Sequence, residues 1–83
     1  MDKGLWAETV AIQHYLSKGC EVFVNASNKG PVDIVVIDPE GNIDLLDVKY
    51  KRASGSPSGR KLTGRQERLG VKIQHVREDG YVL

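Results

Sequence analysis

The chain has 83 residues, of which 40% are hydrophobic and 28% charged, the composition of an ordinary folded protein with one modest core. No apolar run approaches the roughly 20 residues that a membrane-spanning helix needs, and the N-terminal residues lack a signal-peptide layout. A lone cysteine, Cys20, excludes an internal disulfide framework and fits a reducing compartment. We therefore expect a cytoplasmic protein that does not use a membrane.

The charges are divided unevenly along the chain. Residues 1–47 carry three Lys or Arg against eight Asp or Glu, a net charge of −5. Residues 48–83 carry nine against three, a net charge of +6. An acidic half beside a basic half predicts a cation held by carboxylates next to a surface that attracts a polyanion. A solvated surface of mixed charge is the alternative that charge alone leaves open.

Apolar residues recur at helical spacing over 3–18, and Gly19 is a typical C-terminal stop, so we expect a helix here. Glu8 lies toward the side that would pack on a sheet, where a carboxylate is costly unless it is paired or metal-bound. The alternative is that Glu8 lies at the margin and is solvated. Residues 21–25 predict a strand, and a polar connection follows it. In that connection Ser27, Asn28 and Lys29 are candidates for a phosphate contact, with a plain turn as the alternative.

Two short runs rich in β-branched residues, 34–37 and 43–49, predict a β-hairpin, because a Pro/Gly/Asn cluster separates them. Side chains alternate between the two faces of a strand, so Asp47 and Lys49 point the same way. A charged pair at the end of an apolar strand breaks the binary pattern, and such departures concentrate at functional sites.

The Ser/Gly/Pro-rich residues 51–61 predict a flexible loop with basic side chains at both ends. Residues 62–69 can form a short helix, since Thr63 and Gln66 have capping-box spacing and a glycine follows. The remaining elements are a strand over 71–76 and a short terminal strand over 81–83. The whole chain, 1–83, is thus one minimal α/β domain: a mixed β-sheet flanked by helices, in the order α-β-β-β-α-β-β.

Asp33, Asp47 and Lys49 could meet at one end of the central strands, with Glu8 reaching in from the first helix. Converging carboxylates repel one another unless a divalent cation lies between them, and hard oxygen ligands suit Mg²⁺ or Mn²⁺. Such an ion can lower the pKa of a bound water and neutralise charge on a phosphodiester oxygen, and a nearby lysine can orient that water. This arrangement predicts phosphodiester hydrolysis. A salt-bridged sheet end is the alternative.

Glu8 in a first helix, Pro31-Val32-Asp33 at a strand and Asp47-Val48-Lys49 about a dozen residues later resemble the PD-(D/E)XK nuclease superfamily. Residues 4–52 are similar to the opening of archaeal-type Holliday junction resolvases, through Gly4 with Ala7-Glu8, Leu16, Gly19 and the Val22/Val24 strand. The segment with Leu62-Thr63 and Gln66 also resembles the Gln-bearing helix of compact, often phage-borne VRR-type nuclease domains.

The resemblance implies a restriction-endonuclease-like fold and a Mg²⁺-dependent endodeoxyribonuclease. By resemblance Glu8, Asp33 and Asp47 would be metal ligands together with the Val48 carbonyl, Lys49 would be catalytic, and Gln66 would be an auxiliary catalytic-site residue. A homodimer would set two active sites against two strands of branched DNA. Besides Ser27, Asn28 and Lys29, the expected DNA contacts are basic: Lys51, Arg52, Arg60, Lys61, Arg65 and Arg68.

The leading prediction is therefore a structure-selective DNA endonuclease of DNA recombination, a Holliday junction resolvase. One alternative is a VRR-like or phage nuclease that cuts flaps or single strands. The other is an inactive protein of the nuclease fold that binds DNA. The compact length hints at a phage-encoded protein.

Overall fold

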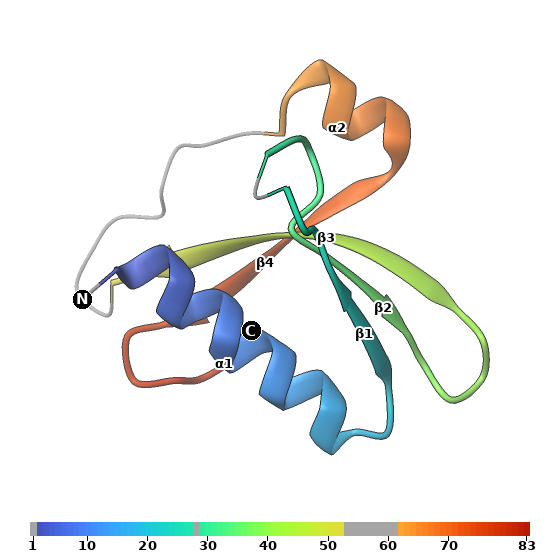
Figure 1. Ribbon diagram of the computed structural model, residues 1–83. Coiled ribbons are helices and arrows are strands. Elements are labelled where there is room, and N and C mark those ends of the chain that lie inside the picture. The colour runs from blue at the N-terminus through green and yellow to red at the C-terminus, as the bar shows by residue number, and fades with distance from the viewer. Residues whose placement is uncertain (1, 28, 53–61) are drawn as a thin grey trace.

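The structure is a computed structural model, and it describes residues 2–27, 29–52 and 62–83. The described elements are α1 (Lys3–Ser17), β1 (Glu21–Val24), β2 (Ile34–Ile37), β3 (Ile43–Lys51), α2 (Gly64–Leu69) and β4 (Val71–Arg77) (Figure 1). The strands form one mixed sheet in the order β1-β2-β3-β4. The first three are antiparallel neighbours, and β4 runs parallel to β3. The predicted α/β class with a mixed sheet is confirmed.

Helix α1 lies across one face of the sheet (Figure 1). It begins where the Asp2 side chain accepts a hydrogen bond from the Leu5 N–H, 3.0 Å long, which satisfies one of the free amides of the first turn. Ala7 and Ala11 are fully buried on its inner side. Their small side chains let the helix approach the sheet closely. The helix matches the predicted range 3–18 to within one residue.

The core lies between α1 and the sheet. Alternate residues of the central strands point into it, and with the two alanines of α1 they form one buried cluster. Each such side chain contributes about 1.5–3 kcal/mol when fully buried. The strand members of the cluster are Ile34 and Val36 of β2, Leu46 and Val48 of β3, and Val76 of β4. Because β3 alternates in this way, Asp47 and Lys49 share the opposite face, as the sequence predicts.

The face of the sheet away from α1 is covered less completely. Helix α2 packs mainly against β4, and Val71 beneath it is buried. Phe23 and Ile43 remain 52% and 63% exposed, and by register Phe23 shares this face with Val35 and Leu45. The described residues thus leave apolar side chains of β1, β2 and β3 open to a partner.

Helix α2 begins with the predicted capping box, in which Thr63 and Gln66 bond each other's backbone N–H groups. It ends at Gly70, whose φ of 76° is left-handed and favours glycine. None of the helices among the described residues is both long and apolar enough to cross a bilayer.

The predicted strand over 81–83 is wrong. The chain after Arg77 makes a single bridge, between Val82 and Val76, flanked by backbone hydrogen bonds of 2.9 Å from Arg77 to Tyr81 and 3.0 Å from Leu83 to His75. This turn returns too few residues beside β4 for a ladder. The observed order in the described residues is therefore α-β-β-β-α-β rather than α-β-β-β-α-β-β.

The predicted loop over 51–61 also begins later than expected. Lys51 is the last residue of β3, because the parallel pairing with β4 extends to Arg77. Residues 53–61 lie outside the described residues.

Candidate functional site

Asp33 stands directly before β2 and is fixed to the backbone of β3. Its N–H donates to the Leu46 carbonyl over 2.9 Å, and its Oδ2 accepts a 2.7 Å hydrogen bond from the Val48 N–H. The first registered pair of the two strands is Ile34 with Leu46, so Asp33 lies one position beyond it, level with Asp47. The hairpin register alone therefore brings two carboxylates to the same end of the sheet.

Asp47 is buried, with 7% of the residue exposed, although it is charged. Lys49 lies two residues further along the same face, and its Nζ is 3.2 Å from the Asp47 Oδ1. A buried carboxylate is strongly disfavoured without a charged or hydrogen-bonding partner, and Lys49 is that partner here. The pairing follows from the two-residue period of a strand.

Burial and neighbouring carboxylates perturb the Asp33 side chain. Burial raises the pKa of Asp33 to about 6, the Val48 N–H opposes this, and the Asp47 side chain and the charge of Glu8 raise it further. The Asp33 carboxyl thus carries a proton more readily than an ordinary aspartate. The largest cause is burial, and the Asp47 and Glu8 carboxylates add to it.

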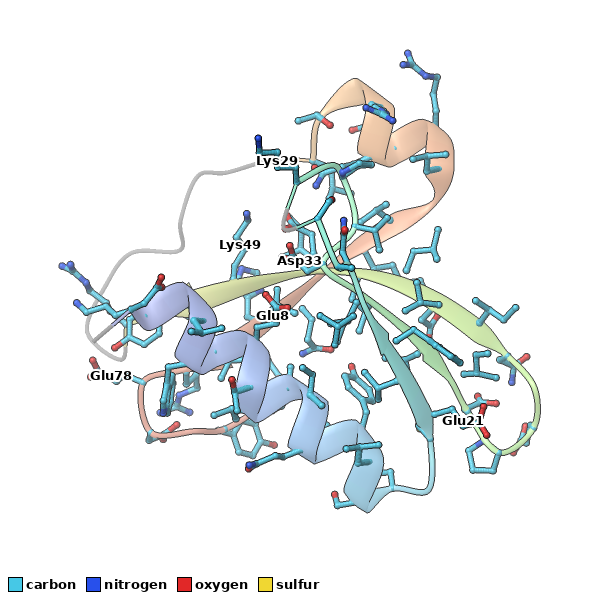
Figure 2. All side chains as sticks on the ribbon, viewed as in Figure 1. Glu8, Glu21, Lys29, Asp33, Lys49 and Glu78 are labelled. Carbon is cyan, nitrogen blue, oxygen red and sulfur yellow. The ribbon has the colours of Figure 1, made fainter. Side chains whose placement is uncertain are left out.

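Glu8 comes from α1 and lines the same cavity as Asp33, with a volume of about 400 Å³. Figure 2 shows Glu8, Asp33 and Lys49 at one end of the sheet, although α1 and β3 are far apart in the sequence. The other residues that line the cavity are Asp2, Gly4, Leu5, Asn25 and Lys29. The helix therefore supplies a third carboxylate to the end of the sheet where the hairpin supplies two.

In the described residues, no three His, Cys, Asp or Glu side chains form a ready-made metal cluster. Asp33 accepts from a backbone N–H, and Asp47 is paired with Lys49. The donor set is nevertheless of one chemical kind, carboxylate oxygen from three residues, which suits a hard divalent cation such as Mg²⁺. Val48 is predicted to add its carbonyl. Its side chain is buried in the core, and its N–H donates to Asp33.

Gln66 acts through the backbone around it. Its Nε2 donates to the Pro31 carbonyl over 3.0 Å, and its Oε1 accepts from the Thr63 N–H over 2.9 Å. Both ends of the buried amide are thereby used, one inside α2 and one on the segment that leads into Asp33. In this geometry Gln66 fixes the segment that leads into Asp33. The auxiliary catalytic role that the resemblance implies stays a prediction.

Among the predicted phosphate contacts, Lys29 lines the cavity and Ser27 lies in the same connection between β1 and β2. Lys51 is half-buried and Arg52 exposed at the far end of β3, near the start of α1 (Figure 1). Arg65 and Arg68 are exposed on α2. The remaining three predicted contacts, Asn28, Arg60 and Lys61, lie outside the described residues.

Two polar residues of the cavity wall are not among the predicted site residues. Asp2 caps α1 and lines the cavity. Asn25, predicted as the end of a strand, follows β1, and its side chain hydrogen-bonds Ser27 and the Lys29 carbonyl in the next turn. The signal for Asn25 was present, because an Asn two residues before a Ser has the spacing of an Asx-turn.

Comparison of the chain with family models, with curated proteins and with solved structures gives no match.

Proposed function

We propose that this protein is a Mg²⁺-dependent, structure-selective DNA endonuclease of the PD-(D/E)XK kind. The observation that carries the proposal is that the hairpin register sets Asp33 level with Asp47, whose Oδ1 is 3.2 Å from the Lys49 Nζ. Glu8 lines the same cavity as Asp33, and burial together with the neighbouring carboxylates raises the pKa of Asp33 to about 6. A carboxylate with a strongly perturbed pKa at a cavity is typical of sites that bind or transform a charged ligand. A chain whose charges served only its fold would not need to bring three carboxylates to the same end of the sheet.

Asp33, Asp47 and Glu8 would hold the divalent cation, since all three offer hard oxygen ligands and their mutual repulsion ends when a cation binds. When bound, the ion lowers the pKa of a coordinated water and neutralises charge on the phosphodiester. The carboxylates would bind the ion, and the Val48 N–H, which donates to Asp33, holds that carboxylate in place.

Lys49 supplies the remaining charge. Its ammonium is held by Asp47, and its side chain is 27% exposed, so a phosphate can reach it. A fixed cation beside the carboxylates stabilises the negative charge that develops on the phosphate oxygens. Lys29, on the cavity wall, adds a second cation for the DNA backbone.

Branched DNA is the proposed substrate, with the four-way junction of recombination first among its forms. A homodimer would place two such sites on two strands at once. The exposed apolar side chains on the sheet face away from α1, Phe23 and Ile43 among them, support self-association, since monomers rarely leave such side chains grouped in water.

A substrate panel tests the proposal. Synthetic four-way junctions, flaps, linear duplex and single strands would be incubated with the protein in Mg²⁺ or in EDTA, and the products resolved on denaturing gels. Paired symmetric nicks confined to junctions support a resolvase. Cutting of flaps or single strands supports the VRR-like alternative, and binding without cutting supports the inactive DNA-binding alternative.

Sedimentation velocity tests the homodimer. We expect Ile43→Asp, on the open sheet face, to convert a dimer into a monomer because it places a charge in an apolar interface. Leu16→Asp is the matched control, since Leu16 is exposed on α1 and away from that face. Dissociation by Leu16→Asp alone would assign the interface to α1 instead.

A further inference from the structure

The half-buried Asn25 uses both ends of its side-chain amide in hydrogen bonds. Its Nδ2 donates to the Lys29 carbonyl over 2.7 Å and to the Val32 carbonyl over 2.9 Å. Its Oδ1 accepts from the Ser27 N–H over 3.0 Å and from the Ser27 hydroxyl over 2.8 Å. One amide group thus binds three residues of the connection between β1 and β2.

The backbone of the same residue points to the candidate site. The Asn25 N–H donates to the Asp33 carbonyl over 3.0 Å, which closes the base of the connection. Gly30, with a φ of 103°, gives the chain the left-handed turn by which it passes the Asn25 amide. Asn25 is therefore hydrogen-bonded to the backbone of both functional residues of the connection: its side chain bonds the Lys29 carbonyl, and its N–H bonds the Asp33 carbonyl.

Those two residues have opposite tasks in the proposed reaction. Lys29 and Asp33 line the same cavity, and Asn25 lines it with them. A phosphate bound by the lysine must lie at a fixed distance from the cation bound by the carboxylate, because small displacements of a reacting group lower the rate steeply. A freely moving connection would not fix that distance.

We propose that Asn25 is a positioning residue that holds Lys29 against the substrate phosphate in register with Asp33. This inference rests on the proposed function and deepens it, since it names the group that couples phosphate binding to the carboxylate site. Asn25 itself touches neither the phosphate nor the cation.

A double-mutant cycle tests the inference. Lys29→Ala should raise KM with little change in kcat and lower the salt slope of DNA binding by about 1, the loss of one phosphate contact. Asn25→Ala should produce the same loss of salt slope and also lower kcat, with kcat/KM falling about 10- to 100-fold, as is typical of residues that orient a metal site. The double variant should bind DNA within about twofold of Asn25→Ala alone, because the lysine is already displaced.

Two further variants separate positioning from folding. Asn25→Asp keeps the acceptor for Ser27, but it replaces both donated hydrogen bonds by a carboxylate oxygen that faces two carbonyls, so it should lower the melting temperature. It should match Asn25→Ala in KM and kcat when both variants are assayed well below their melting temperatures, where they are fully folded. Asn42→Ala is the matched control. Its amide bonds Asp38 over 3.0 Å in the turn at the other end of the hairpin, and we expect unchanged kinetics.

The outcomes distinguish this inference from the proposed function. Additive effects of the Asn25 and Lys29 substitutions on DNA binding, measured in Ca²⁺ without cleavage, would overturn the inference even if the enzyme cuts DNA. Wild-type activity in Asn25→Asp would also overturn it. If the wild type binds DNA but never cleaves it, the proposed function fails, while non-additive binding would still support the positioning role of Asn25.

Discussion

Strand β2 has an aspartate at each end, and the two behave in opposite ways. Asp38, after the strand, accepts hydrogen bonds from the Asn42 side chain, the Asn42 N–H and the Glu40 N–H, at 2.9 to 3.0 Å. The bonds from Asn42 hold the pKa of Asp38 below its usual value. Asp33, before the strand, has its pKa raised to about 6 by burial and by neighbouring carboxylates.

The difference shows how one residue type serves structure at one end of a strand and is poised for chemistry at the other. A tight turn supplies Asp38 with enough donors to satisfy its charge. Asp33 receives one backbone N–H, and Asp47 and Glu8 add negative charge around it. Negative charge that the protein does not neutralise itself is free to bind a cation.

The largest effect should come from Asp47→Asn at the site end. We expect DNA cleavage in Mg²⁺ to fall at least about a thousandfold, because the substitution removes an anionic ligand and the partner of Lys49. DNA binding in Ca²⁺ should persist, since phosphate contacts come from other residues. Single-turnover gel assays and fluorescence anisotropy measure the two quantities. Unchanged cleavage would rule out this site assignment.

The second effect concerns the stability of the metal-free protein. Asp33 has a folded-state pKa of about 6 against 3.8 for an unperturbed aspartate, so the stability that its proton confers is present below pH 4 and lost as pH rises through 6. Asp33→Asn cannot ionise and still accepts from the Val48 N–H. Solvent screens this half-buried group, so we expect a gain of about 1 kcal/mol at pH 8, or about 4–8 °C in melting temperature.

Thermal melts in EDTA at pH 4 and pH 8 measure this gain, which should be absent at pH 4. Added Mg²⁺ should raise the melting temperature of the wild type at pH 8 and leave Asp33→Asn nearly unchanged. A variant that is less stable than the wild type at pH 8 would show that the carboxylates at this end are satisfied, as Asp38 is.

An effect of similar size on stability should follow from Gln66→Ala, which tests how the site end is held. The substitution leaves the Pro31 carbonyl and the Thr63 N–H without their partner, and we expect a loss of about 1–2 kcal/mol in the free energy of unfolding. Cleavage should fall less than about tenfold if Gln66 only positions this segment. Gln13→Ala, exposed on α1, is the matched control for the urea titrations. A loss of cleavage as large as that of Asp47→Asn would make Gln66 catalytic instead.

The hairpin and its charged pair could be predicted from sequence because their determinants are local. Strand periodicity alone places Asp47 and Lys49 on one face, and the capping box sets the start of α2 from two residues. The sequence also predicts that Asp33 lies near Asp47, since the turn between the strands fixes their register.

Other features could not be predicted, because they depend on contacts between distant segments. The bond from Gln66 to Pro31 spans the fold, and nothing in the local pattern distinguishes it from a simple cap. The end of the last strand depends on how many residues return beside β4, which periodicity over 81–83 overestimates. The sequence places Asn25 at the end of a strand and does not predict its role. That role depends on the Lys29 and Val32 carbonyls, which only the folded connection brings to its side chain.

The smallest effect should come from Asp38→Asn at the turn end. The pKa of Asp38 is lowered in the folded state, so its charge stabilises the protein above pH 3.8, and this contribution is lost as pH falls through the folded-state pKa. An asparagine still accepts from the Glu40 and Asn42 N–H groups, so we expect a slightly lower melting temperature at pH 7 and a smaller difference at pH 3. Cleavage should equal that of the wild type, because the turn lies at the opposite end of β2 from Asp33 (Figure 1). If Asp38→Asn reduced cleavage as much as Asp47→Asn, cleavage would depend on negative charge anywhere on the hairpin. The two ends of β2 would then not differ in function.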